Sequence, residues 1–133
     1  MDNLTWEEKT ELLDRFGKRV IEFRDNNLEF FMEHATTGKS VNPVMRKQYG
    51  ILATLSDEQR EKVNDLLSET ITTAIFDFLH MFADYEDEMK LILIKDGKEY
   101  DYTRITEHAG SEIACHEDDG WIQKFSKVGR FVL

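Results

Sequence analysis

The chain is poor in cysteine, proline and glycine. Among its 133 residues there is a single cysteine, Cys115. An intrachain disulfide and the common zinc frameworks, with four cysteines or two cysteines and two histidines, are therefore excluded by count. With one proline, seven glycines and 41% apolar residues, the composition also excludes disorder as the dominant state. A lone thiol is typical of a reducing compartment, so we expect a cytoplasmic protein.

Long apolar runs are missing as well. No segment approaches the roughly 18 apolar residues that a membrane-spanning helix needs. Residues 1–8 lack the basic start and the apolar run of a signal peptide. We therefore expect a soluble protein with no membrane partner. The length suits one domain rather than a two-domain enzyme, and we predict a single domain over residues 1–133.

Basic residues are outnumbered, with 17 Lys and Arg against 27 Asp and Glu, which gives a net charge of -10. This charge repels nucleic-acid phosphates, so we expect no nucleic-acid partner. Most of this excess of acidic residues lies in residues 57–89, which contain ten acidic residues and only two basic ones, Arg60 and Lys62. Residues 35–56, in contrast, contain three basic residues and no acidic one. Such an acidic surface favours a basic protein partner, although it also favours solubility alone.

Helical signals dominate the first half of the chain. Thr5 and Glu8 have the spacing of a capping box, and apolar residues then recur at helical intervals. The polar run 25–27 leaves open whether the first helix is one bent helix or two. Asn42 followed by Pro43 is a typical helix start, so we predict a short helix through about residue 55.

The strongest helical pattern begins at Ser56. Ser56 and Gln59 form a second capping box, and the apolar residues that follow predict a helix to about Tyr85. Phe76 falls nearly opposite Phe78, so the middle of this helix is apolar on more than one side. We therefore place this helix at the centre of the fold.

The periodicity then changes from helical to alternating. Strand-like segments at 91–95 and 98–103 flank the dipeptide Asp96-Gly97, which favours a type I′ hairpin turn. This turn pairs Leu93 with Tyr100 on the face towards the core.

Because the first strand is apolar on both faces, a third strand is expected over 112–116, and a terminal strand over 128–133. The predicted fold class is α+β, with N-terminal helices around a long central helix, packed on a small antiparallel sheet containing the β-hairpin.

Two clusters are candidate metal sites. In the predicted helix 56–85, Asp77, His80 and Asp84 lie on one polar stripe, a pattern that converges two carboxylates and an imidazole. A solvated stripe explains the same residues without an ion.

The second cluster combines a thiol with imidazoles, which ligate zinc or form an activated nucleophile. Its residues are His108, Cys115 and His116. Their spacing favours neither chemistry, and a buried cysteine at the end of a strand explains them equally well. A small metal-dependent hydrolase is therefore the enzymatic alternative.

Three stretches carry a resemblance to a known group of proteins: residues 73–80, the Asp96-Gly97 turn, and residues 120–126. Their order over 57–126 resembles small uncharacterised bacterial proteins, some of which are similar to the immunity proteins of polymorphic toxin systems. The resemblance implies tight stoichiometric binding of a basic toxin.

We therefore expect a non-enzymatic binding protein that needs no cofactor and engages a basic protein partner. The interface is expected at the acidic end of the predicted helix 56–85, with exposed aromatic anchors. Its candidate residues are Phe76, Asp77, Asp84, Glu86, Asp87, Glu88 and Trp121. The chain is a monomer or a homodimer in this hypothesis. A further alternative is a homodimeric scaffold in which the central helix packs against its copy.

Overall fold

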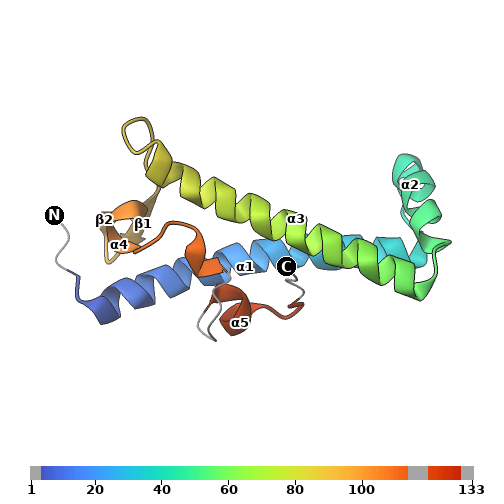
Figure 1. Ribbon diagram of the computed structural model, residues 1–133, viewed down its shortest axis with the longest axis horizontal. Helices are drawn as coiled ribbons and strands as arrows, with labels where there is room; N and C mark the ends of the chain where they lie inside the picture. The colour runs from blue at the N-terminus through green and yellow to red at the C-terminus, as the bar shows by residue number, and fades with distance from the viewer. Residues whose placement is uncertain (1–3, 114–119, 130–133) are drawn as a thin grey trace.

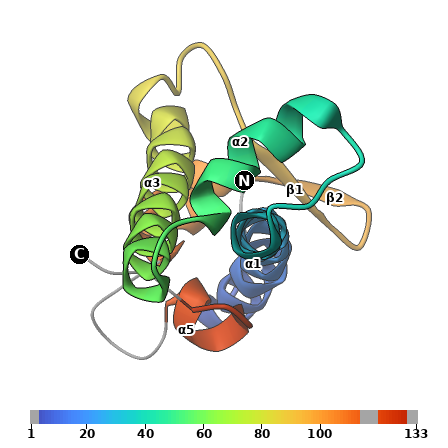
Figure 2. The same cartoon turned by 90° about the vertical axis from the view of Figure 1, so that its right-hand side faces the viewer.

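The computed structural model describes residues 4–113 and 120–129. The helices and strands follow one another as α1 (Trp6–Thr37), α2 (Pro43–Ala53), α3 (Asp57–Asp84), β1 (Ile92–Lys95), β2 (Lys98–Asp101), α4 (Tyr102–Ile105), the 3₁₀ helix η1 (Ser111–Ile113) and α5 (Trp121–Phe125). Two long helices, α1 and α3, pack against each other, with α2 at one end and the hairpin β1-β2 at the other (Figure 1 and Figure 2). The predicted α+β fold is confirmed.

The first helix, α1, is continuous over 32 residues. It begins at the predicted capping box, in which the Glu8 backbone N–H donates to Thr5 Oγ1 and the Thr5 N–H donates to Glu8 Oε1, both at 3.1 Å. It ends at Gly38, whose φ of 66° suits glycine. The run 25–27 does not break it, because Asp25 is only 4% exposed and its carboxylate bonds outside the helix.

The starts of α2 and α3 also follow their predicted caps. The Val44 N–H donates to Asn42 Oδ1 at 2.9 Å, and Pro43 occupies the first helical position. Ser56 and Gln59 bond reciprocally, at 3.1 and 3.0 Å.

The hairpin has the predicted turn and register. Asp96 and Gly97 have φ angles of 52° and 78°, as a type I′ turn requires, and Leu93 pairs with Tyr100. The hairpin lies against the N-terminal half of α1, where Arg15 donates to the Ile94 carbonyl at 2.8 Å. Its two strands form the whole sheet that the described residues contain.

Strand predictions beyond the hairpin are wrong where the structure describes them. The second strand ends at Asp101 because its side chain caps α4 by accepting from the Thr103 N–H at 3.1 Å. Residues 112 and 113 of the expected third strand belong instead to η1 (Ser111–Ile113), which follows Gly110 at a φ of 87°. Residues 114–116 and 130–133 lie outside the described residues, and residues 128 and 129 are not in a strand.

The core lies where α1, α3 and the C-terminal segments meet. Its buried residues are Ile21, Leu79, Tyr102, Ala109, Ile113, Trp121 and Ile122. The Trp121 ring lies directly over Gly17, where an added Cβ would be 2.3 Å from Trp121 Cε2. Phe16 contacts Trp121 and Tyr102 edge to face, with ring centroids 5.8 and 5.6 Å apart. Because Trp121 is 1% exposed, the prediction that it is an exposed anchor is wrong.

Among the helices described, none combines the length and the apolar character needed to cross a membrane.

Candidate functional site

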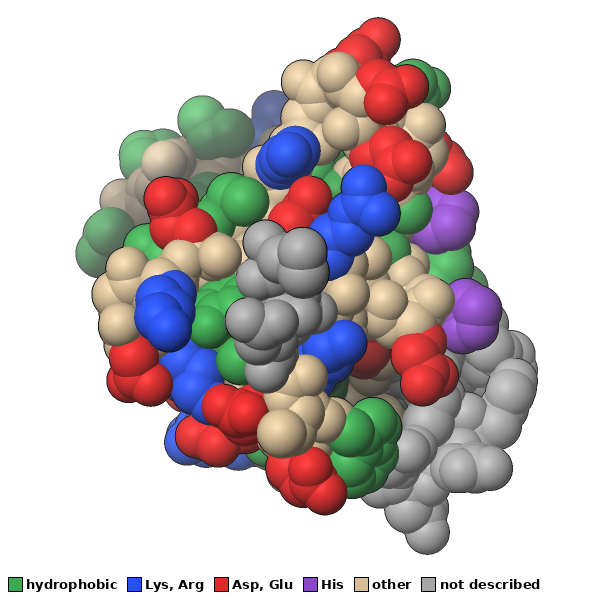
Figure 3. Space-filling model, turned by 90° about the vertical axis from the view of Figure 1, so that its left-hand side faces the viewer, with side chains coloured by type: hydrophobic (Ala, Val, Ile, Leu, Met, Phe, Trp, Pro, Cys, Tyr) green, Lys and Arg blue, Asp and Glu red, His purple; other side chains and the backbone are tan. Residues whose placement is uncertain are grey.

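The end of α3 and the turn that follows project from one end of the molecule (Figure 1). The carboxylates predicted for the interface are all exposed there: Asp77, Asp84, Glu86, Asp87 and Glu88. In the view onto this end, acidic side chains gather at the top of the molecule (Figure 3). We call these five residues, together with Phe78 and Tyr85, the acidic tip.

The carboxylates of the acidic tip are largely uncompensated. Asp84 Oδ1 lies 3.4 Å from His80 Nε2, and this is the one ion pair that the tip forms with described residues. Both partners are about half exposed, so the pair contributes little to stability. The tip therefore presents its negative charge to solvent and to any approaching protein.

Two aromatic side chains accompany these charges. Phe78 is 55% exposed. Tyr85, which follows the last residue of α3, is 52% exposed. Phe78 rests edge to face on the buried Phe82, with centroids 5.4 Å apart. Phe78 is thus held in place while half of its surface stays open, which suits an anchor in a protein interface.

Phe76, the aromatic residue predicted for the interface, is less exposed than Phe78. Phe76 is partly buried and packs against the core cluster, and its ring stacks on His80 at 5.7 Å. Its carbonyl is 2.7 Å from the position of a Cβ added at Gly110, so the 110 loop closes over it. The sequence pattern did not distinguish Phe76 from Phe78, because both lie in a stretch that is apolar on two sides.

The position of the tip is unfavourable for helix stability. The last turn of α3 contains no basic residue, and Asp84 is its final residue. A carboxylate at the negative end of the helix dipole typically costs about 0.3–1 kcal/mol. The acidic residues at this helix end are therefore not explained by stability of the fold.

The first candidate metal site is incomplete. His80 Nδ1 lies 3.3 Å from the Ala109 carbonyl and its Nε2 faces Asp84, so both ring nitrogens already have partners. Within residues 4–113 and 120–129, no three His, Cys, Asp or Glu side chains come together as a metal would require. Asp77 is exposed on the same helix but does not complete a site.

The second candidate metal site is only partly described. His108 is exposed, whereas Cys115 and His116 lie outside the described residues. The described residues thus include one of the three candidate residues of this site.

A buried polar network around Arg24 was not predicted from the sequence. Arg24 is fully buried, and its guanidinium donates to Asp25 Oδ1 at 2.8 Å and to Thr72 Oγ1 at 3.0 Å. Further acceptors are Ser68 Oγ, Ser126 Oγ and the Gly129 carbonyl. Burial lowers the pKa of Arg24, and the Asp25 carboxylate opposes that shift.

The carboxylate of Asp25 completes this network by accepting from the Ser126 hydroxyl at 2.9 Å and the Lys127 N–H at 2.7 Å. Each of these groups bonds to Arg24 or to Asp25, so the network ties α1 to α3 and to the C-terminal segment. A signal was present in the sequence, because Arg24 and Asp25 fall between Ile21 and Leu28 on the apolar stripe of α1.

Comparison of the chain with models of protein families, with curated proteins and with solved structures gives no match. The assignment of function therefore depends on the residues and their geometry.

Proposed function

We propose that this chain is a non-enzymatic binding protein whose acidic tip engages a basic protein partner. The observation that carries the proposal is the combination at the end of α3. Five exposed carboxylates, four of them without an ion-pair partner among the described residues, occur in the same segment as the half-exposed Phe78 and Tyr85. This arrangement destabilises the end of α3, and it favours the binding of a partner surface with complementary charge.

The two parts of the tip have different roles in binding. The carboxylates raise the rate of encounter, because their field attracts a positively charged surface over distances comparable with the Debye length. Phe78 and Tyr85 then lose their remaining exposed surface in the contact and slow dissociation. The resemblance to immunity proteins supports a narrower form of this proposal, in which the partner is a basic toxin that the chain neutralises.

The proposal is tested by producing the chain together with the products of neighbouring genes and isolating the complex. Affinity for the partner is then measured by calorimetry for the wild type, for the tip-reversal variant D84K/E86K/D87K, and for F78S. We expect both variants to lose at least about tenfold in affinity.

A control variant separates the effect of the acidic tip on binding from the effect of net charge. E7K/E11K/E29K changes the charge by the same amount on exposed positions of α1 and should bind nearly as well as the wild type. Equal losses in the control and in the tip-reversal variant would show that net charge alone governs binding, and the tip would then not be the site.

A further inference from the structure

The helix α3 is packed on one side and open on the other. Among the described elements, α1 and η1 are the ones that pack most extensively against it, and α1 runs along one side of α3 (Figure 1 and Figure 2). The buried residues of α3 are Asn64, Ser68, Thr72, Leu79 and Phe82. With 3.6 residues per turn, these positions share one side of the helix, so the opposite side faces away from α1.

The open side of α3 is apolar along most of its length. Leu66 is 61% exposed and Phe78 is 55% exposed, and Ala74 between them is also exposed. Three partly exposed apolar residues lie on the same side. We call the row Val63, Leu66, Leu67, Ala74, Phe78 and Met81 the α3 seam. Its members recur at intervals of three, four and seven residues, which is the spacing with which one helix packs against another.

The length of the α3 seam suits a second helix. From Val63 to Met81 the seam extends over about 27 Å, given a rise of about 1.5 Å per residue. This is the length of a partner helix of about 18 residues. A row of this length and spacing is matched by the apolar stripe of an amphipathic helix, whose side chains fit between those of α3.

The charge along the α3 seam has one sign. Residues 63–88 contain seven acidic residues and no lysine or arginine. Asp77 is exposed within the length of the seam, Glu69 is partly exposed, and the acidic tip follows at its C-terminal end. The nearest basic residues along the chain, Arg60, Lys62 and Lys90, lie beyond the two ends of this segment. A helix with lysine and arginine beside its apolar stripe is therefore complementary to the seam.

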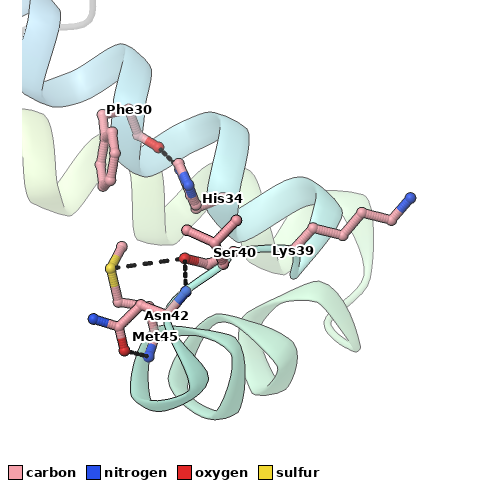
Figure 4. Close-up of a pocket in the computed structure, with 7 residues that line it drawn as sticks. Phe30, His34, Lys39, Ser40, Asn42 and Met45 are labelled. Atoms are coloured by element: carbon pink, nitrogen blue, oxygen red, sulfur yellow. Dashed lines mark hydrogen bonds between the residues drawn. The ribbon is translucent and has the colours of Figure 1, made fainter.

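A second open apolar surface, at the other end of the molecule, lacks this uniform charge. It is a hollow between Phe30 and His34 of α1 and the connection that leads to α2 (Figure 4). Lys39 and Glu33 are both exposed there, so charges of both signs surround it. Because charge selects no partner for this surface, it provides a control for binding to exposed apolar side chains in general.

We propose that the α3 seam docks an amphipathic helix of the basic partner. The apolar stripe of that helix covers the seam, and its lysine and arginine side chains meet the flanking carboxylates and the acidic tip. The inference rests on the proposed function and names the element that the partner presents. A second copy of the chain is a poor occupant, because each copy has a net charge of -10 and like charges oppose association.

The test uses a synthetic peptide in place of the partner helix. The labelled probe has about 18 residues, all leucine or lysine, with the leucines at intervals of three and four so that they form one face. A scrambled peptide of the same composition has no such face but carries the same charge. Fluorescence anisotropy measures the affinity of the full chain for both peptides. The wild type should bind the amphipathic peptide at least about tenfold more tightly than the scrambled one.

Two double variants locate the binding surface. L66Q/A74Q makes two exposed positions of the α3 seam polar and should lose about tenfold in affinity for the amphipathic peptide. V44Q/I51Q makes two exposed positions of α2 polar, at the other end of the molecule, and should bind like the wild type. Equal affinity for the two peptides, an unchanged affinity in L66Q/A74Q, or an equal loss in V44Q/I51Q would each overturn the α3 seam as the docking site.

The tip variant D84N/E86Q/D87N separates this inference from the proposed function. We expect it to bind the amphipathic peptide more weakly than the wild type, as L66Q/A74Q does. A loss in the tip variant alone would leave the acidic tip as the binding surface and would refute docking on the α3 seam. A loss in L66Q/A74Q alone would support docking on the seam and would refute the part assigned to the acidic tip.

Discussion

Gly17 shows how one small residue in a long helix sets the position of the core. Glycine in a helix interior is less favourable than alanine by about 1 kcal/mol, yet it stands in the middle of α1. The reason is the Trp121 ring, which occupies the space that a Cβ would need. The sequence pattern does not reveal this role of Gly17, because the partner that requires it is 104 positions away.

We predict that Gly17→Ala lowers the free energy of unfolding by about 1–3 kcal/mol, since overpacking of the core exceeds the gain in helix propensity. Chemical denaturation measures the change. The matched control is Gly50→Ala in α2, where no atom lies within 4 Å of the added Cβ, and it should be neutral or stabilising by up to about 1 kcal/mol. Two variants of equal stability would contradict the packing described for Trp121.

Arg24 is the second residue on which the fold depends. Its side chain is buried together with Asp25, Thr72 and Ser68, so removal of the guanidinium leaves an uncompensated buried carboxylate. Arg24 and Asp25 are neighbours in the sequence, but the other hydrogen-bond partners of Arg24 lie in α3 and in the C-terminal segment. Periodicity places Arg24 and Asp25 on the apolar stripe of α1, but it does not reveal these distant partners.

Arg24→Met is expected to destabilise the chain by about 3–5 kcal/mol, the usual cost of removing one partner of a buried ion pair. Its control is Arg19→Met on the same helix, where the Arg19–Glu22 pair is exposed and contributes about 0–1 kcal/mol. Thermal unfolding followed by circular dichroism compares the two variants. A loss for Arg24→Met as small as that for Arg19→Met would refute the structural role of the network.

At the scale of elements, the sequence predicted the helix starts and the turn whose determining residues are close together in the chain. The caps at Thr5, Asn42 and Ser56 and the turn Asp96-Gly97 predicted the helix starts and the hairpin register. The prediction failed after Asp101, where the polypeptide turns into α4 and η1 instead of adding strands. That path depends on tertiary contacts.

One of these contacts shows why the loop after α4 was not predictable. The buried Tyr102 hydroxyl accepts from the Gly110 N–H at 2.8 Å and donates to Glu112 Oε1 at 2.8 Å. Burial is the main reason that the pKa of Tyr102 is raised. The bonds hold the loop in place through a residue that alternation alone assigns to a strand.

The cap at the start of α1 makes a prediction about pH. Donation from the Thr5 backbone N–H, followed by the Thr5 side chain, holds the pKa of Glu8 below its ordinary value of 4.5. The lowered pKa means that Glu8 stabilises the fold fully above pH 4.5, and that this contribution is lost as the pH falls through the lower pKa of the folded state. Carbon-detected NMR titration should give a Glu8 midpoint below 4.5.

The variant Glu8→Gln provides the control for that titration. The stability difference between Glu8→Gln and the wild type should shrink as the pH falls below 4.5, because both side chains are then neutral. A Glu8 midpoint at or above 4.5 would mean that the capping box does not form in solution.

At the scale of the whole molecule, the acidic tip lies at one end of the long axis (Figure 1). A packed core occupies the region between α1, α3 and the C-terminal segments. The sequence predicted the carboxylates of the tip correctly as exposed, because four of them lie in the acidic run 84–88 and Asp77 lies on the polar stripe of α3. It did not predict Phe78 as the open aromatic residue, because exposure there depends on which side of α3 the 110 loop covers.

The most direct measurement of the central claim is the association rate constant with the basic partner, measured by stopped flow over a salt series. For the wild type the rate constant should fall steeply with rising salt, and for D84N/E86Q/D87N it should be lower at low salt and depend less on salt. The two proteins should converge at high salt, where the charges are screened. Identical rate constants and identical salt dependence for wild type and variant would contradict the assignment of the acidic tip as the binding surface.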